Sequence, residues 1–201
     1  MKRTLVAVMI LAAAPLAMAN LVDMALDSSN AANIADITGF VTDDITGVEV
    51  AQKYGLSGWM YWDGPKFSFP AQDFTAAGIE IQVESRYHQT DNLESDPPRY
   101  AYDDANLWLL IEDINGNLAD LAWGDPWTQD EWKTQVYPLD GVVFPDGFDA
   151  TQVVKVVTRS TNWGAADPSI DYINFSHLTV TPEPASLALL ALGGLALIRR
   201  R

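Results

Sequence analysis

The sequence predicts an all-β fold, a single antiparallel β-sandwich. Three observations support this prediction. Helical periodicity is scarce between residues 20 and 181. Eight or nine short apolar or alternating runs follow one another in this region, with Gly, Pro, Asn or Asp between them. The region holds 162 residues, which fits one domain with a sizeable core.

The first part of this region gives the weakest signals. Residues 20–37 are rich in Ala, Asn and Asp, and they predict either an irregular lead-in or a short helix. Residues 47–53 alternate around two valines and predict a strand. Residues 59–62 precede Asp63-Gly64-Pro65, and 66–69 follow it. This arrangement predicts a hairpin whose turn lies at Asp63–Pro65.

The middle of the region gives the clearest strands. Residues 78–87 place Ile79, Ile81 and Val83 on one face and polar side chains on the other, which is typical of a half-buried antiparallel strand. Residues 106–112, NLWLLIE, are apolar almost throughout and predict a central strand.

A turn and four more strands complete the prediction. Residues 113–117, DINGN, contain Asn-Gly, a strong hairpin signal. Further strands are expected at residues 118–123, 132–137, 152–158 and 170–180.

The N-terminus has the parts of a secretory signal peptide. Lys2-Arg3 precede an apolar run, which ends in the small-residue pattern Ala17-Met18-Ala19. Signal peptidase would remove residues 1–19 by cutting between Ala19 and Asn20, so the protein is expected to be exported. The alternative is a buried N-terminal helix.

The C-terminus pairs a short apolar segment with a basic end. Residues 185–198 are uncharged, and as a helix they would rise about 21 Å, against a hydrocarbon core of about 30 Å. Such a transmembrane helix would span only marginally, with Arg199, Arg200 and Arg201 on the cytoplasmic side. We therefore expect a transient inner-membrane intermediate; a plain anchor is the alternative.

Pro182-Glu183-Pro184, the apolar segment and the terminal arginines together resemble the PEP-CTERM sorting signal, over residues 182–201. The resemblance implies recognition by an exosortase, a membrane cysteine protease of Gram-negative bacteria that would cut near Pro-Glu-Pro. The region between the two terminal signals, residues 20–181, which we call the body, would then be secreted or attached to the cell surface. Proteins of this kind accompany extracellular polysaccharide and biofilm matrix.

The composition of the body limits the classes of molecule that it can bind. Residues 20–181 hold seven basic and 26 acidic side chains, a formal charge of −19. This charge argues against nucleic acid and anionic membrane surfaces, and it favours solubility, cation binding or a solvated acidic coat. The chain has no cysteine, which excludes thiol catalysis, Cys-ligated zinc and iron–sulfur clusters.

Aromatic side chains are the candidate ligand contacts, because sugar rings stack on exposed aromatic faces. Trp127 and Trp163 lie in loop-like segments and are the candidate ligand-binding residues; otherwise they pack as lids over the sandwich ends. Trp108 lies inside an apolar strand and is expected in the core.

The order of features in the body resembles the jelly-roll sandwiches of non-catalytic carbohydrate-binding modules. The resemblance rests on the aliphatic strand and hairpin of 107–118, the segment 148–153 before a Val-rich strand, and the closing strand at 170–175. It implies a binding domain that contacts extracellular polysaccharide.

Metal and enzyme signals are weaker. Asp113-Ile114-Asn115-Gly116-Asn117 begins like a calcium loop but has Gly124 where the distal Glu should stand, so a hairpin turn is expected. A structural Ca²⁺ elsewhere has no defined ligands, and no other cofactor is expected. The adjacent Ser176 and His177 would point to opposite faces of a strand and form no triad, so no catalytic residue is assigned.

The sequence therefore predicts an exported, exosortase-sorted protein of the cell surface or extracellular matrix, with a non-catalytic binding or structural β-sandwich. Two alternatives stay open. One is a secreted polysaccharide-active enzyme of the glycoside hydrolase or lyase type, because the body has many carboxylates. The other is a matrix filler whose acidity holds water and cations.

Overall fold

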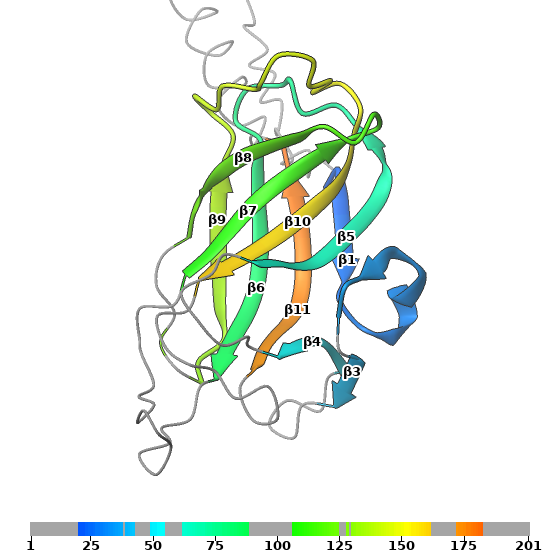
Figure 1. Cartoon of the computed structure of the whole chain (residues 1–201), viewed down its shortest axis with the longest axis vertical. Coiled ribbons are helices and arrows are strands. Elements are labelled where there is room, and N and C mark those ends of the chain that lie inside the picture. Colours follow the sequence, from blue (N-terminus) through cyan, green and yellow to red (C-terminus); the bar gives the residue numbers. More distant parts are fainter. Residues whose placement is uncertain are drawn as a thin grey trace, which may run out of the picture. The chain divides into compact units, whose positions relative to one another are not determined.

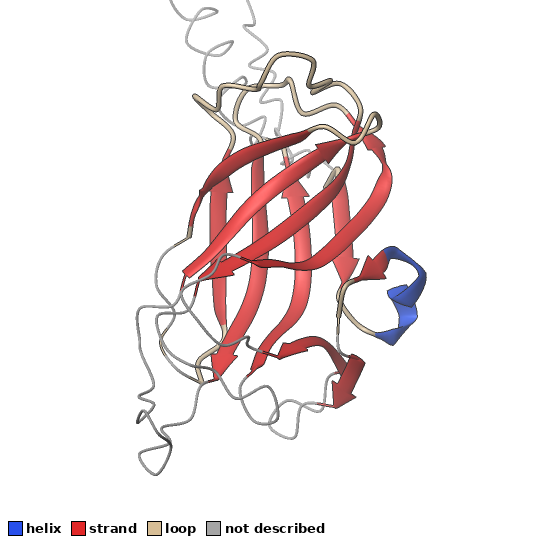
Figure 2. Ribbon diagram, viewed as in Figure 1, coloured by secondary structure: helices blue, strands red, loops and turns tan. Residues whose placement is uncertain are grey.

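The strands of the described part of the chain form two antiparallel β-sheets (Figure 2). The computed structural model describes residues 20–37, 39–42, 49–54, 62–88, 106–124, 128, 130–161 and 172–182. One short 3₁₀ helix, η1 (Ser28–Asn33), accompanies the strands. The all-β prediction is confirmed.

The first sheet has six strands. Its order is β3-β4-β11-β6-β9, and β1 pairs with β11 outside this path. β1 and β4 both pair with β11, β4 over residues 172–175 and β1 over residues 177–180. The bounds are β1 Val22–Ala25, β3 Gly39–Thr42, β4 Glu49–Tyr54, β6 Glu80–His88, β9 Lys133–Pro138 and β11 Tyr172–Thr181.

The second sheet has five strands in the order β2-β5-β10-β7-β8, and it lies in front in Figure 1. Its strands are β2 Ile34–Ala35, β5 Trp62–Gln72, β7 Asn106–Asp113, β8 Leu118–Trp123 and β10 Val153–Thr161. β10 is the central strand, paired with β5 on one side and β7 on the other.

The core lies between the sheets. Ile79, Ile81 and Val83, from β6 and the residue before it, are fully buried, as their alternation predicted. From the facing sheet, Phe67 meets Phe175 of β11 edge to face, with ring centroids 5.6 Å apart. The burial of such side chains, each contributing about 1.5–3 kcal/mol, holds the two sheets together.

The predicted hairpin at residues 59–69 is wrong, because β5 runs unbroken from Trp62 to Gln72. Arg159 pairs with Asp63 and Val157 pairs with Lys66, so Gly64 and Pro65 together face the single residue Thr158. This is a β-bulge. A bulge accepts Gly and Pro as readily as a turn does, because the ladder is already interrupted there.

The lead-in of residues 20–37 contains the predicted short helix and also two strands that the sequence did not reveal, β1 and β2. Asp27 caps η1 by accepting a 2.8 Å hydrogen bond from Ser29 N. Strand β3 was also unforeseen. The remaining strands agree with the predictions to within a few residues.

Three loops close one end of the sandwich, and we call them the cap: residues 73–79, 114–117 and 139–152. Backbone hydrogen bonds join them, from Phe74 N to Ala150 O (2.8 Å) and from Ile114 N to Gln152 O (2.9 Å). A side-chain bond from Asn117 Nδ2 to Gly147 O (3.0 Å) adds to these. The loops therefore form one connected structure.

The hairpin predicted at residues 113–117 is confirmed. Gly116 N donates to Asp113 O (3.0 Å), and Asp113 N donates to Asn117 O (3.0 Å). Gly116 has φ of +84°, which a residue with a side chain rarely adopts.

Candidate ligand-binding face

The outer face of the five-stranded sheet gathers aromatic, basic and acidic side chains. Because Leu107, Leu109 and Ile111 of β7 point into the core, the alternate residues point outward. The register places outward residues of β10 opposite those of β7. We call this surface the binding face, and it comprises Asp36, Lys66, Trp108, Leu110, Glu112, Asp120, Lys155, Val157 and Arg159.

Trp108 is an aromatic residue of the binding face whose side chain the structure describes. Its cross-strand neighbour Arg159 places the guanidinium carbon 5.1 Å from the centre of the indole ring. Arg159 also lies 3.9 Å from Asp120 of β8, measured from Nη1 to Oδ1. The expectation that Trp108 lies in the core is therefore wrong: its side chain is half-buried on the outside of the sheet.

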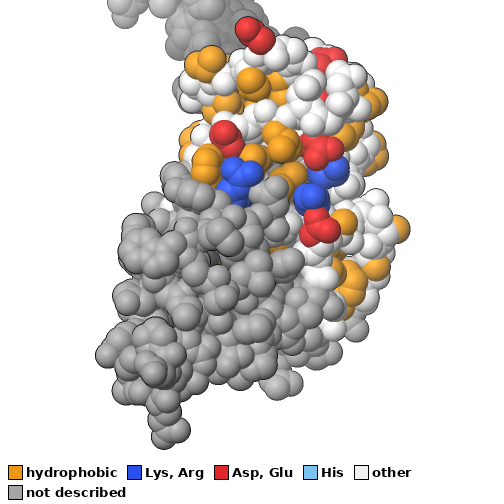
Figure 3. Space-filling model, viewed as in Figure 1, with side chains coloured by type: hydrophobic (Ala, Val, Ile, Leu, Met, Phe, Trp, Pro, Cys, Tyr) orange, Lys and Arg blue, Asp and Glu red, His pale blue; other side chains and the backbone are white. Residues whose placement is uncertain are grey.

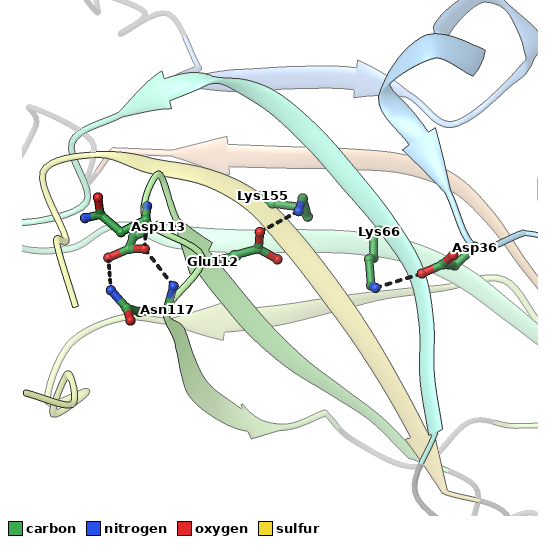
Figure 4. Close-up of polar contacts among 7 residues, drawn as sticks. Asp36, Lys66, Glu112, Asp113, Asn117 and Lys155 are labelled. Atoms are coloured by element: carbon green, nitrogen blue, oxygen red, sulfur yellow. Dashed lines mark hydrogen bonds and ion pairs between the residues drawn. The ribbon is translucent and has the colours of Figure 1, made fainter. Parts of the chain in front are cut away.

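Two further ion pairs lie on the same face (Figure 4). Lys155 Nζ is 2.6 Å from Glu112 Oε1, between β10 and β7. Lys66 Nζ is 2.8 Å from Asp36 Oδ2, between β5 and the residue that follows β2. All four side chains stay between 21% and 50% exposed. Exposed and half-exposed ion pairs of this kind add about 0–1 kcal/mol each to stability.

The side chains at the centre of the binding face are apolar and almost inaccessible to solvent. Leu110 and Val157 face each other across β7 and β10, and they are only 2% and 1% exposed although they lie outside the core cluster. A ligand would therefore meet the charged groups and Trp108 around this apolar centre. Figure 3 shows the resulting surface, with basic and acidic groups side by side among hydrophobic side chains.

Basic residues are concentrated here. Lys66, Lys155 and Arg159 are three of only seven basic residues in the body, and each has an acidic neighbour on the same face. The described charged side chains of the binding face are thus three basic and three acidic, whereas the body as a whole has a formal charge of −19.

The histidines form no catalytic cluster with Ser176. His177 Nε2 lies 2.6 Å from Asp23 Oδ1, whereas Ser176 Oγ donates to Glu84. The hydrogen bonds from His177 and Asn20 lower the pKa of Asp23. His88 Nδ1 lies 2.6 Å from Asp130 Oδ1. The hydrogen bond of His177 is thus to Asp23 and that of His88 is to Asp130, while Ser176 is bonded to Glu84.

Asp113 is occupied by protein donors. Its two carboxylate oxygens accept hydrogen bonds from Asn115 N, Asn117 N, Asn117 Nδ2 and Asp149 N, all of 2.8 or 2.9 Å. Four N–H groups directed at one carboxylate leave no lone pair suitably placed for calcium. The sequence of this turn, which resembles the start of a calcium loop, therefore reflects a hairpin. Among the described residues, no group of three or more Asp, Glu or His side chains is arranged to hold a metal.

Several predicted site residues lie outside the described part of the chain. They are Trp127 and Trp163, Ala17 and Ala19 of the cleavage pattern, and Glu183, Pro184, Arg199, Arg200 and Arg201 of the sorting signal. Asn20 is exposed and Pro182 is half-buried. In the part of the chain that the structure describes, no helix is long and apolar enough to span a bilayer. Residues 185–198 are not in that part.

Residues 180–201 match the PEP-CTERM protein-sorting motif. The chain ends in a PEP-CTERM sorting motif. This confirms the resemblance stated for its last residues, and the motif begins within the last two residues of β11. No curated protein matches the chain in sequence.

The body of the chain has the fold of carbohydrate-binding modules. A crystal structure of a family 30 carbohydrate-binding module is 14% identical, with a TM-score of 0.52, over 81% of this chain and 89% of that chain. A second structure of a family 30 module has 14% identity and a TM-score of 0.51, over 81% and 100%. A family 11 module of the cellulosomal cellulase Lic26A-Cel5E of Clostridium thermocellum is 13% identical, with a TM-score of 0.46, over 82% and 89%.

Proposed function

We propose that this protein is exported, sorted through its PEP-CTERM motif, and used outside the cell as a non-catalytic domain that binds neutral polysaccharide. The binding surface in this proposal is the outer face of the five-stranded sheet. Exosortase would release the body to the cell surface or the extracellular matrix.

The observation that carries the binding role is the cluster of Trp108, Arg159 and Asp120. An indole offers an apolar surface to the C–H groups of a sugar ring, and neighbouring charged groups orient the sugar by hydrogen bonds to its hydroxyls. The guanidinium of Arg159 carries five N–H donors, and it lies 3.9 Å from the carboxylate of Asp120. Lys155 and Glu112 repeat the pairing of a donor with an acceptor farther along the same strands.

The distribution of charge on the body favours a neutral polysaccharide as the ligand. Among its described side chains, the binding face combines three basic with three acidic groups, while the body as a whole is strongly acidic. A polyanion approaching this face would be repelled by the surrounding charge. A neutral chain meets no such repulsion and can use both the donors and the acceptors.

The test is the binding of the secreted protein to soluble neutral and anionic polysaccharides, measured by affinity electrophoresis and calorimetry. We expect retardation by a neutral glycan, lost or weakened at least tenfold in Trp108→Ala and Arg159→Ala. Lys133→Ala, on the other sheet, removes the same charge as Arg159→Ala and should bind normally. Equal binding by all three variants would reject the binding face. Release of oligosaccharides by the wild type would favour the enzyme alternative.

The place of the sorting motif supports processing at the end of the body. Val180 is fully buried, and Thr181, the last residue of β11, is paired with Glu80. A cut before Val180 would remove part of a strand that three other strands use. We therefore place exosortase cleavage after Thr181.

A further inference from the structure

The cap exposes apolar side chains to solvent. Val143 is 88% exposed, Ile114 is 59% exposed, and Leu118, the first residue after the 114–117 turn, is 41% exposed. Among the described residues, one further large hydrophobic is exposed, Val136 on β9. It lies two residues before the strand ends at the cap. Exposed aliphatic side chains of this sandwich therefore gather at one end.

Both ends of the body emerge at this same end. Thr181 and Pro138 are paired with Glu80 from its two sides, and Leu139 N then donates to Ile79 O (2.8 Å), where the longest cap loop begins. Leu21 N donates to Val180 O (2.8 Å), so the first described residues also lie beside the end of β11. Figure 1 shows the cap loops at the end toward which β11 runs.

We propose that the cap rests on the lipid surface of the inner membrane as long as the apolar C-terminal segment is inserted there. This inference rests on the transient inner-membrane intermediate that the sequence predicts for the sorting route proposed above. Only three residues separate Thr181 from Ala185, the first residue of the apolar segment. Even fully extended, this connection spans about 14 Å. The end of β11, and with it the cap, must therefore stay close to the bilayer.

The cap suits a brief contact. Its loops are already joined by hydrogen bonds, so little order has to be gained when their tips meet lipid. Asp140 and Asp146 are exposed on the same loops, and their charges oppose anionic headgroups. The aliphatic tips therefore bind only while the C-terminal segment holds them at the surface, and the cap leaves the membrane once the segment is cut off.

The absence of cysteine allows a direct test with single labelled sites. Val143→Cys and Ile114→Cys carry an environment-sensitive fluorophore at the cap. Ala122→Cys carries it at the exposed far end of β8 as the control. The full chain, without the signal peptide that export removes, is mixed with vesicles of phosphatidylethanolamine containing a minor share of phosphatidylglycerol, and flotation reports whether it binds. The secreted, processed protein is measured in parallel.

For the full chain, we expect a blue-shifted emission at residues 143 and 114 and protection from a water-soluble quencher, with no change at residue 122. The processed protein should not float with the vesicles, and the emission of its fluorophore should not change. If the full chain floats and the probes at 143 and 114 behave like the probe at 122, the cap contact is rejected while the insertion stands. If the full chain does not float, the proposed insertion fails and the cap contact fails with it.

Discussion

Asp113 shows how one residue serves a whole end of the sandwich. Its side chain is almost fully buried, and its four hydrogen bonds come from the hairpin turn and from the loop at Asp149. Burial acts to raise the pKa of this carboxyl, but the hydrogen bonds from Asn117, Asp149 and Asn115 outweigh it and hold the pKa at about 2.

The pKa of Asp113 predicts a loss of stability in acid. An unfolded Asp titrates near 3.9, so the folded state favours the charged form. The stabilisation by Asp113 is complete above about pH 4 and is lost as the pH falls toward about 2. Thermal unfolding followed by near-ultraviolet circular dichroism should show Tm falling through this window.

Asp113→Asn should lower Tm at pH 7 by several degrees, because the amide nitrogen donates where backbone N–H groups need an acceptor. It should also flatten the decline of Tm between pH 4 and 2. Asp146→Asn, at an exposed position of the cap, is the matched control and should leave both unchanged. If the two variants unfold alike, Asp113 is not the anchor of the cap.

Trp108 marks a limit of prediction at the residue scale. The run Asn106–Asp113 is apolar on both faces, and Leu110 is buried although it points outward. Apolarity therefore could not show which face meets the core.

At the scale of elements, strands with clear alternation were predictable, and those without it were not. Residues 78–87 alternate because one face of β6 packs against the core and the other does not. β1 has four residues and pairs with β11, and β2 has two and pairs with β5. Such short strands leave little pattern in the sequence.

The bulge in β5 gives a prediction at this scale. A side chain on Gly64 would place its Cβ 2.6 Å from Thr158 Oγ1 and 3.3 Å from Thr158 O. Thr158 Oγ1 is held by its 2.9 Å hydrogen bond to Pro65 O. Gly64→Ala should therefore destabilise the fold by about 1–3 kcal/mol, measured by chemical denaturation.

Gly39→Ala is the control for Gly64→Ala, because a Cβ at Gly39 of β3 meets nothing within 4 Å. Its effect should stay within about 0.5 kcal/mol. In the double variant Gly64→Ala/Thr158→Ala, removal of the Thr158 hydroxyl should relieve part of the clash. The double variant should therefore lose less stability than the sum of the losses in the two single variants. Equal stability of Gly64→Ala and Gly39→Ala would contradict the bulge geometry.

At the scale of the whole molecule, the sequence predicted two sheets but not their strand order. Turn residues and alternation identify strands and hairpins such as β7–β8, whose partners are neighbours in the chain. The pairing of β11 with β1, β4 and β6 joins residues far apart in sequence. Likewise, the binding face combines residues from β5, β7, β8 and β10, so no local pattern could reveal it.

The route of the whole chain out of the cell gives the last prediction. Replacement of Pro182, Glu183 and Pro184 by alanine should trap the protein in the inner-membrane fraction, because the processing protease loses its recognition sequence while the apolar segment remains. Immunoblots of membrane and medium fractions measure this. Glu131→Ala instead removes an exposed acidic residue that lies outside the cap, and this variant should be released normally.

The intact mass of the released wild-type protein identifies both cuts. It should match a chain that begins at Asn20 and ends after Thr181, because Val22 and Val180 are buried opposite each other at the two ends of the body. A mass that requires a cut before Val180 would contradict the proposed boundary, since such a protein would lack the end of β11. Unchanged release of the alanine variant would show that Pro-Glu-Pro is not the signal that the protease reads.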